Sequence, residues 1–167
     1  LAAFDLAGGI DELAIAERDG TDVAILPIVG LAPTAGSVIG SSTDGIHLKV
    51  IAADLDLDTD TDLLVSAQSL EPGGQIGVHL SILDNAAGSL VAGPESVEIV
   101  TLAAPFVSWP GHPVAGDSDG DGDLDVVIGR EDALLFEQGP GQTFSLEART
   151  ELGFSSAFDA PPAALVD

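Results

Sequence analysis

The chain has 167 residues, with 28 Asp or Glu against 4 Lys or Arg, and its formal net charge of −24 argues against nucleic acid and against anionic membrane surfaces as partners. Because 46% of the residues are hydrophobic, the chain can fold as a domain with a core and is not a disordered acidic tail. It contains no cysteine, which excludes disulfides and thiolate metal sites, whereas its acidity suits divalent cations or high salt.

The first motif along the chain is a weak acidic loop in the stretch AFDLAGGIDELAIA, which we call the first loop. Asp5 stands where such a loop would open and Glu12 where it would close, but the middle acids are absent, so we expect it to hold no ion. Residues 23–43 then carry no charge, yet Pro27, Pro33 and three glycines indicate short strands and turns. We therefore predict no membrane insertion.

Two longer stretches place aspartates on alternate positions directly before an apolar run. The second loop, residues 54–62, lies in ADLDLDTDTDLLVSA, and the third loop, residues 117–125, lies in GDSDGDGDLDVVIG. Their aspartates are Asp54, Asp56, Asp58, Asp60 and Asp62, and Asp117, Asp119, Asp121, Asp123 and Asp125. Carboxylates so close together repel one another unless a cation lies among them.

Calcium is the cation that this pattern favours, because it takes six to eight oxygen ligands at about 2.3–2.6 Å in irregular geometry. A curled loop brings the acids at its first, third and fifth positions together, the seventh position offers a backbone carbonyl, and the ninth closes the site. We predict two calcium ions, one in the second and one in the third loop. An EF-hand would need Glu where the chain has Ile128, and the alternative without metal is a solvated acidic turn.

The second loop departs from the third at two positions. Leu57 and Thr59 stand where the third loop has Gly120 and Gly122, the residues that permit a tight curl. A β-branched residue is strained in a left-handed conformation. We therefore expect the second loop to curl differently and to bind its ion more weakly.

The loops recur with the spacing of a repeat. The acids that open them, Asp5, Asp54, Asp117 and an Asp167 that opens a fourth copy, are 49, 63 and 50 residues apart. Alternating apolar residues predict a half-buried strand at 75–83, and short strands are predicted at 124–129, 133–137, 144–149 and 163–166. Four strands in about 50 residues are typical of a β-propeller blade. We therefore predict an all-β chain of about three four-stranded antiparallel blades, in units 1–53, 54–116 and 117–167, with a candidate insertion between residues 85 and 113.

The segments DSDGDGDLDVVIG and DLDLDTDTDLLVSA, and more loosely GGIDELAIA, resemble the FG-GAP/VCBS repeats. That resemblance spans nearly the whole chain as three blade-length units. It implies a calcium-binding β-propeller, as in the integrin α-subunit head and many secreted bacterial proteins. Its loops, of the pattern D-x-D-x-D-G-x-x-D, join strands of a blade and hold one calcium each.

Motifs for catalysis are missing from the sequence. We find no G-x-S-x-G, S-x-x-K or H-E-x-x-H pattern, and the three histidines are scattered. His79 alternates with Val78, which predicts a position facing solvent, His112 is interpreted as a loop residue, and Trp109 as a packing residue. The chain is thus predicted not to be an enzyme.

Function follows from these exclusions and from the resemblance. We expect a secreted or cell-surface calcium-binding module for adhesion, recognition or extracellular assembly. Its partner would be a protein or glycan at the cell surface, or copies of itself. The alternatives are a structural subunit of an extracellular fibre, or part of a propeller-type enzyme that degrades polysaccharides. Because closed propellers have about four to eight blades and this chain has about three, we expect it to be a fragment of a longer polypeptide.

Overall fold

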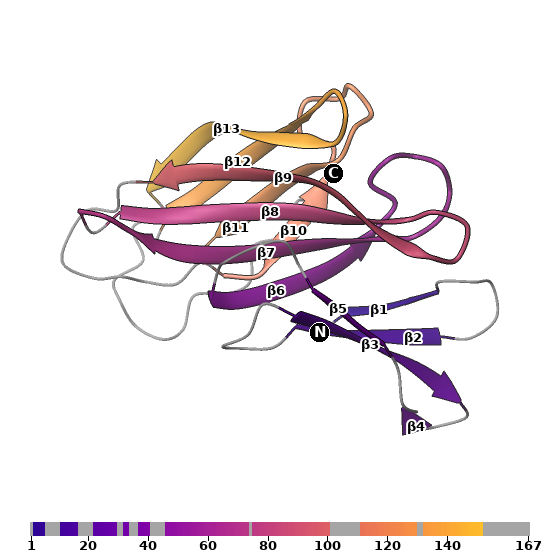
Figure 1. Ribbon diagram of the computed structural model, residues 1–167. Helices are drawn as coiled ribbons and strands as arrows, with labels where there is room; N and C mark the ends of the chain where they lie inside the picture. The colour runs from indigo at the N-terminus through magenta and orange to yellow at the C-terminus, as the bar shows by residue number, and fades with distance from the viewer. Residues whose placement is uncertain are drawn as a thin grey trace.

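The computed structural model describes residues 2–5, 11–16, 22–29, 32–33, 37–40, 46–73, 75–100, 111–129 and 132–151. Every element of regular secondary structure in these residues is a β-strand, which confirms the all-β prediction. The strands form three antiparallel sheets, stacked as layers in Figure 1.

The first sheet contains β1 (Ala2–Asp5), β2 (Asp11–Ala16), β3 (Asp22–Val29), β4 (Ala32–Pro33) and β5 (Ser37–Gly40). The second sheet contains β6 (Ile46–Ala53), β7 (Asp62–Glu71), β8 (Gln75–Asn85) and β9 (Leu90–Val100). The third sheet contains β10 (Pro113–Gly116), β11 (Asp125–Gly129), β12 (Asp132–Gly139) and β13 (Thr143–Glu151). In the second and third sheets each strand pairs with the next along the chain, so both are simple meanders.

Within the uncharged stretch at residues 23–43, the described residues belong to β3, β4 and β5, which confirms the strands that the sequence predicts there. No helix among the described residues has the length and apolar character needed to cross a bilayer. The predicted strand at 163–166, Asp167 and Trp109 lie outside the described residues. Part of the candidate insertion is ordinary sheet, because β9 extends from Leu90 to Val100.

The second sheet is the middle layer, and its central strands β7 and β8 are buried on both faces over most of their length. On β7, Leu63 and Val65 face a core shared with the first sheet, whereas Leu64 faces a core shared with the third. The core between the second and third sheets is filled by Leu80, Phe136 and their neighbours, and each such side chain contributes about 1.5–3 kcal/mol by leaving water. The sequence predicted a half-buried strand at 75–83; this is wrong, because the side chains of β8 between 76 and 83 are buried on both faces.

The second and third sheets are stacked with their strands in the same order. The first strand of the second sheet, β6, contacts β10 of the third sheet and β1 and β2 of the first, and β9 contacts β13. The backbone N–H of Phe144 on β13 donates to Ser96 Oγ on β9 at 2.7 Å, which ties the last strands together. Four-stranded meanders stacked in this way place equivalent loops of successive sheets near one another.

The acidic loops join the first strand of a sheet to its second strand. The second loop follows β6 and ends at the first residue of β7, and the third loop follows β10 and ends at the first residue of β11. At the base of each loop the register pairs Ala53 with Asp62 and Gly116 with Asp125. A unit counted from one acidic loop to the next therefore differs from a sheet by one strand. The strands β6 and β10 each belong to the same sheet as the loop that follows them, but they fall in the preceding unit.

Candidate metal centres

Backbone hydrogen bonds to its own aspartates curl the third loop. The bonds run from the N–H of Gly120 to Asp117 Oδ1 (2.7 Å), of Gly122 to Asp117 Oδ2 (3.2 Å), of Asp121 to Asp119 Oδ1 (3.0 Å) and of Asp123 to Asp121 Oδ1 (2.9 Å). Gly120 and Gly122 have φ angles of 83° and 101°, a left-handed conformation that glycine adopts without steric cost. The alternation of Asp and Gly is therefore what lets this loop close on itself.

The second loop adopts the same curl without glycine. Its bonds run from the N–H of Thr59 to Asp54 Oδ2 (3.1 Å), of Asp58 to Asp56 Oδ1 (3.2 Å) and of Asp60 to Asp58 Oδ1 (2.8 Å). Leu57 and Thr59 have φ angles of 64° and 81°. The expectation that this loop curls differently is wrong, because its aspartates accept three of the four corresponding hydrogen bonds and hold two non-glycine residues in a left-handed conformation; the fourth bond is absent, and Asp54 Oδ1 accepts none from the described residues.

Each loop is closed by a buried aspartate that also reaches the third strand of its sheet. Asp62 is 0% exposed and accepts from the N–H of Leu55 and of Asn85, both at 2.8 Å. Asp125 is 1% exposed and accepts from the N–H of Ser118 (2.9 Å), from the Ser118 hydroxyl and from the N–H of Gln138 (3.0 Å). These bonds satisfy carboxylates that would otherwise be costly to bury.

In each loop three carboxylates offer oxygens that lie within 4.8 Å of one another. The two groups are Asp54, Asp56 and Asp58 in the second loop, and Asp117, Asp119 and Asp125 in the third. Oxygens bound to one calcium ion at about 2.3–2.6 Å are separated by similar distances. Of the ten aspartates predicted as ligands, Asp60, Asp62, Asp121 and Asp123 are not in these groups, and their role as ligands stays a prediction.

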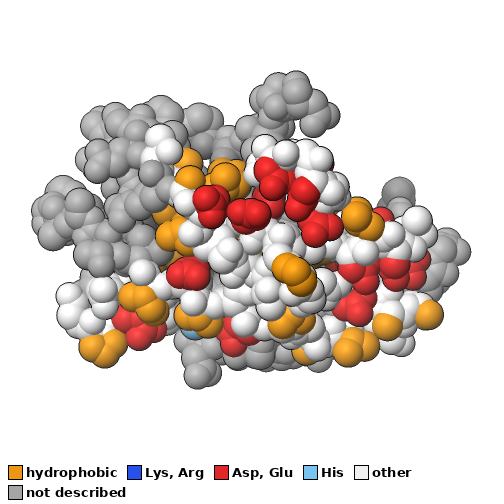
Figure 2. All heavy atoms as spheres, turned by 90° about the horizontal axis from the view of Figure 1, so that it is seen from above, with side chains coloured by type: hydrophobic (Ala, Val, Ile, Leu, Met, Phe, Trp, Pro, Cys, Tyr) orange, Lys and Arg blue, Asp and Glu red, His pale blue; other side chains and the backbone are white. Residues whose placement is uncertain are grey.

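The residues present fit a hard cation. All donors in the two groups are carboxylate oxygens, which suit calcium, magnesium or manganese better than softer metals. Asp54 Oδ1 is buried and has no hydrogen-bond partner among the described residues, so a cation would complete its coordination. Figure 2 shows Asp and Glu side chains in groups on one face of the molecule.

The electrostatics of the loops point the same way. Burial, and after it the charges of Asp62, Asp58 and Asp84, raises the pKa of Asp56. Burial, together with the charges of Asp84 and Asp58, also raises the pKa of Asp62 against the lowering effect of its hydrogen bonds. Carboxylates thus destabilise one another's charged form, and a bound cation would reverse that effect.

Two acids on the third strands were not singled out from the sequence. Asp84 stands one residue before Asn85, and Glu137 stands one residue before Gln138, so they occupy equivalent positions. Burial, and then the charges of Glu147, Asp119 and further third-loop aspartates, raises the pKa of Glu137. Both acids could have been identified from the sequence, because each is followed directly by an amide residue near the end of the third strand of its sheet.

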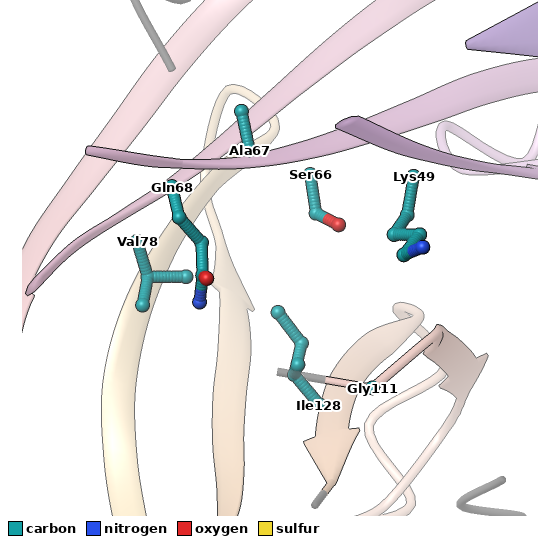
Figure 3. Close-up of a pocket in the computed structure, with 7 residues that line it drawn as sticks. All are labelled: Lys49, Ser66, Ala67, Gln68, Val78, Gly111 and Ile128. Atoms are coloured by element: carbon teal, nitrogen blue, oxygen red, sulfur yellow. The ribbon is translucent and has the colours of Figure 1, made fainter. Parts of the chain in front are cut away.

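A small polar cavity lies between the second and third sheets. Lys49, Ser66 and Gln68 point into it from β6 and β7, with Ile128 on the opposite side (Figure 3). Its volume is about 10 Å³, close to what one water molecule needs. Gln68 is 4% exposed, and neither polar atom of its side chain has a hydrogen-bond partner in the described part of the chain. The cavity is too small for an organic ligand.

Lys49 also acts electrostatically beyond this cavity. Burial, followed by the charge of Lys49, lowers the pKa of His112. His112 lies directly before β10, which agrees with its interpretation as a loop residue.

His79 is part of a hydrogen-bonded row across the second sheet. His79 Nε2 is 2.8 Å from Ser69 Oγ on β7, and His79 Nδ1 is 2.9 Å from Glu95 Oε1 on β9. The predicted solvent-facing position is wrong: His79 is 9% exposed, because both faces of the sheet are covered. The order of groups is that of a serine hydrolase triad, but Ser69 donates its single hydroxyl proton to Glu71 Oε1 at 2.6 Å and not to His79.

Comparison with family models, with curated proteins and with solved structures finds no match. The class of the sites therefore rests on their geometry: two acidic loops on an all-β scaffold, each with an aspartate triad that could hold a metal ion.

Proposed function

We propose that this chain is a calcium-binding module of β-propeller blades that acts outside the cell in adhesion, recognition or assembly. The observation that carries the proposal is the duplicated geometry of the second and third loops. Both curl through three corresponding backbone bonds and close on a buried aspartate, and both gather three carboxylates, at the first, third and fifth positions of the second loop and the first, third and ninth of the third. Two unrelated acidic turns would not be expected to share left-handed φ angles at matching positions, least of all where one of them has Leu57 and Thr59 in place of glycine.

Calcium is favoured over magnesium by the character of the donors. Magnesium demands near-octahedral geometry and keeps several waters, whereas calcium accepts many oxygens from an irregular loop. The carboxylates of the second loop are Asp54, Asp56 and Asp58, which alternate along one short segment. Such a segment offers backbone carbonyls between the acids as further oxygen ligands.

The propeller part of the proposal is supported by the stacking of the sheets. The second and third sheets, both meanders, pack face to face with first strand near first strand and last strand near last strand, and β6 also contacts the first sheet through β1 and β2. Closed propellers have about four to eight blades. Further blades, from a longer chain or from a neighbouring copy, would complete the ring.

A role in assembly is favoured by apolar side chains exposed on the edge strand β9. Val91, Val97 and Ile99 are 51%, 46% and 47% exposed, on a strand that forms the edge of its sheet in the described part of the chain. Copies of this chain or a cell-surface protein are suitable partners for such an edge. Among the described residues no feature favours the polysaccharide-degrading alternative.

Isothermal titration calorimetry of the chelator-treated protein tests the calcium proposal. We expect two calcium ions to bind, with magnesium at the same concentration binding far more weakly. Asp119→Asn should abolish binding at the third loop, because Asp119 belongs to the carboxylate group there. Asp123→Asn is the matched control: it removes the same charge from the same loop but lies outside the group, so binding should persist. Equal effects of the two substitutions, or no calcium binding at all, would refute the proposal.

Light scattering with and without calcium tests assembly. A calcium-dependent increase in mass that Val97→Ser and Ile99→Ser suppress supports an assembly role. A monomer at every calcium concentration contradicts it and favours recognition of a different partner.

A further inference from the structure

The two candidate calcium loops are joined by a chain of buried hydrogen bonds. The third loop closes on Asp125, whose Oδ1 accepts from the backbone N–H of Gln138 at 3.0 Å. The Gln138 side chain then crosses to the second sheet, where its Nε2 donates to the carbonyl oxygen of Leu55 at 2.8 Å. Leu55 is the second residue of the second loop, and its own N–H donates to Asp62 Oδ2.

The four residues that form this series of hydrogen bonds are all shielded from water. Asp125, Gln138, Leu55 and Asp62 are 1%, 6%, 1% and 0% exposed. A backbone carbonyl only accepts hydrogen bonds, so the amide nitrogen of Gln138 is the atom that must face Leu55. A buried hydrogen bond has no competing water, and leaving its donor or acceptor unpaired is costly. The positions of the two loop closures are therefore not independent.

We propose that Gln138 is a positioning residue that couples calcium binding in the second loop to calcium binding in the third. The inference rests on the proposed function, because it requires both loops to bind the ion. An ion in the third loop fixes Asp125 and the end of β12. Gln138 then holds the carbonyl of Leu55 in place and thereby the start of the second loop. An ion that enters the second loop finds it already ordered, which gives positive cooperativity.

Direct charge repulsion between two bound cations acts in the opposite direction. It would make the first ion weaken the second, so its sign differs from that of the proposed coupling. Replacing Gln138 by methionine leaves all charges unchanged and keeps the backbone N–H that binds Asp125. The substitution thus removes only the side-chain bond between the sheets.

The chain offers a matched control in Gln68. Like Gln138, it is a buried glutamine on a strand of this inter-sheet region, at 4% exposure. Its side chain has no hydrogen-bond partner in the described residues. Gln68→Met therefore repeats the chemical change without breaking a link between loops.

Calcium titrations of six proteins test the coupling: the unchanged chain, Gln138→Met and Gln68→Met, each with and without Asp119→Asn to disable the third loop. In the unchanged chain, Asp119→Asn is expected to weaken calcium binding at the second loop about 5- to 10-fold. The factor should fall to about one in the Gln138→Met background and stay unchanged in the Gln68→Met background. A substitution that merely destabilised the fold would lower both affinities and leave the factor in place.

A factor that survives in Gln138→Met, or a factor near one in the unchanged chain, overturns the proposal while leaving calcium binding itself intact. Absence of calcium binding in the unchanged chain refutes the proposed function, and the coupling with it.

Amide hydrogen exchange gives a second measurement that leaves Gln138 untouched. In Asp56→Asn, which disables the second loop, calcium can occupy only the third. The N–H of Leu55 is expected to exchange several-fold more slowly when calcium is added, because its loop is held through Gln138. No change in the exchange of Leu55, with slowed exchange in the third loop, would contradict the coupling.

Discussion

Replacing Thr59 by glycine is expected to make the protein more stable. Thr59 has a φ angle of 81° and an exposed side chain, so the change removes strain without removing packing. A left-handed conformation costs a residue with a Cβ atom about 1–2 kcal/mol, which the substitution removes. Glycine also makes the unfolded chain more flexible, which lowers the free energy of unfolding by about 0.5–1 kcal/mol. The net increase in the free energy of unfolding is therefore about 0.5–1 kcal/mol. The N–H that donates to Asp54 is kept.

Urea denaturation in excess chelator measures this change from the midpoint and the slope. Thr61→Gly, the same substitution two residues further along the loop, is the control. Thr61 is not among the described residues with positive φ, so glycine there relieves no strain; it brings an entropic cost of about 0.5–1 kcal/mol and also removes a half-buried side chain. If Thr59→Gly lowered the free energy of unfolding as much as Thr61→Gly does, the strain argument would be refuted.

Three further outcomes are expected. Adding calcium to about a thousand times its dissociation constant should raise the free energy of unfolding by about 4 kcal/mol per site, measured by urea denaturation with and without chelator. In chelator, the raised pKa of buried Asp62 adds stability that is fully present below its ordinary pKa of 3.8 and is lost as the pH rises through the raised pKa. In a calcium-loaded sample, stability should instead increase with pH, because protons compete with the ion for the carboxylates. Gly77→Ala should destabilise the fold by about 1–3 kcal/mol, because its Cβ would collide with Ser69 Oγ, and Ser69→Ala in the same chain should recover part of that loss in thermal melts.

The strands and the acidic loops could be predicted from the sequence because their signals are local. Alternating apolar residues predicted β8, and the run of aspartates predicted a loop directly before β7 and before β11. That a buried strand follows each loop was also predicted, whereas the strand that precedes each loop in the same sheet was placed in the preceding unit. These inferences need only a few neighbouring residues.

The features that the sequence could not predict depend on contacts between distant segments. The side chain of Gln138 meets the carbonyl of Leu55 across 83 positions of the chain, and Gln138 belongs to no motif. His79 was placed toward solvent because period-two alternation cannot tell whether the second face of a sheet is also covered. Thr59 was expected to resist the curl, since propensity does not count the hydrogen bonds that Asp54 supplies.

The covering of the second sheet on both faces has a consequence for how the protein can come apart. Leu64 and Leu80 depend on the third sheet for their cover, and Leu63 and Val65 depend on the first. Cleavage that releases the third sheet would therefore leave an apolar surface on a sheet that is itself intact. In such a chain each sheet is stable only when a neighbouring sheet covers its apolar face, as in repeat proteins. We expect the smallest fragment that folds to be a pair of adjacent sheets.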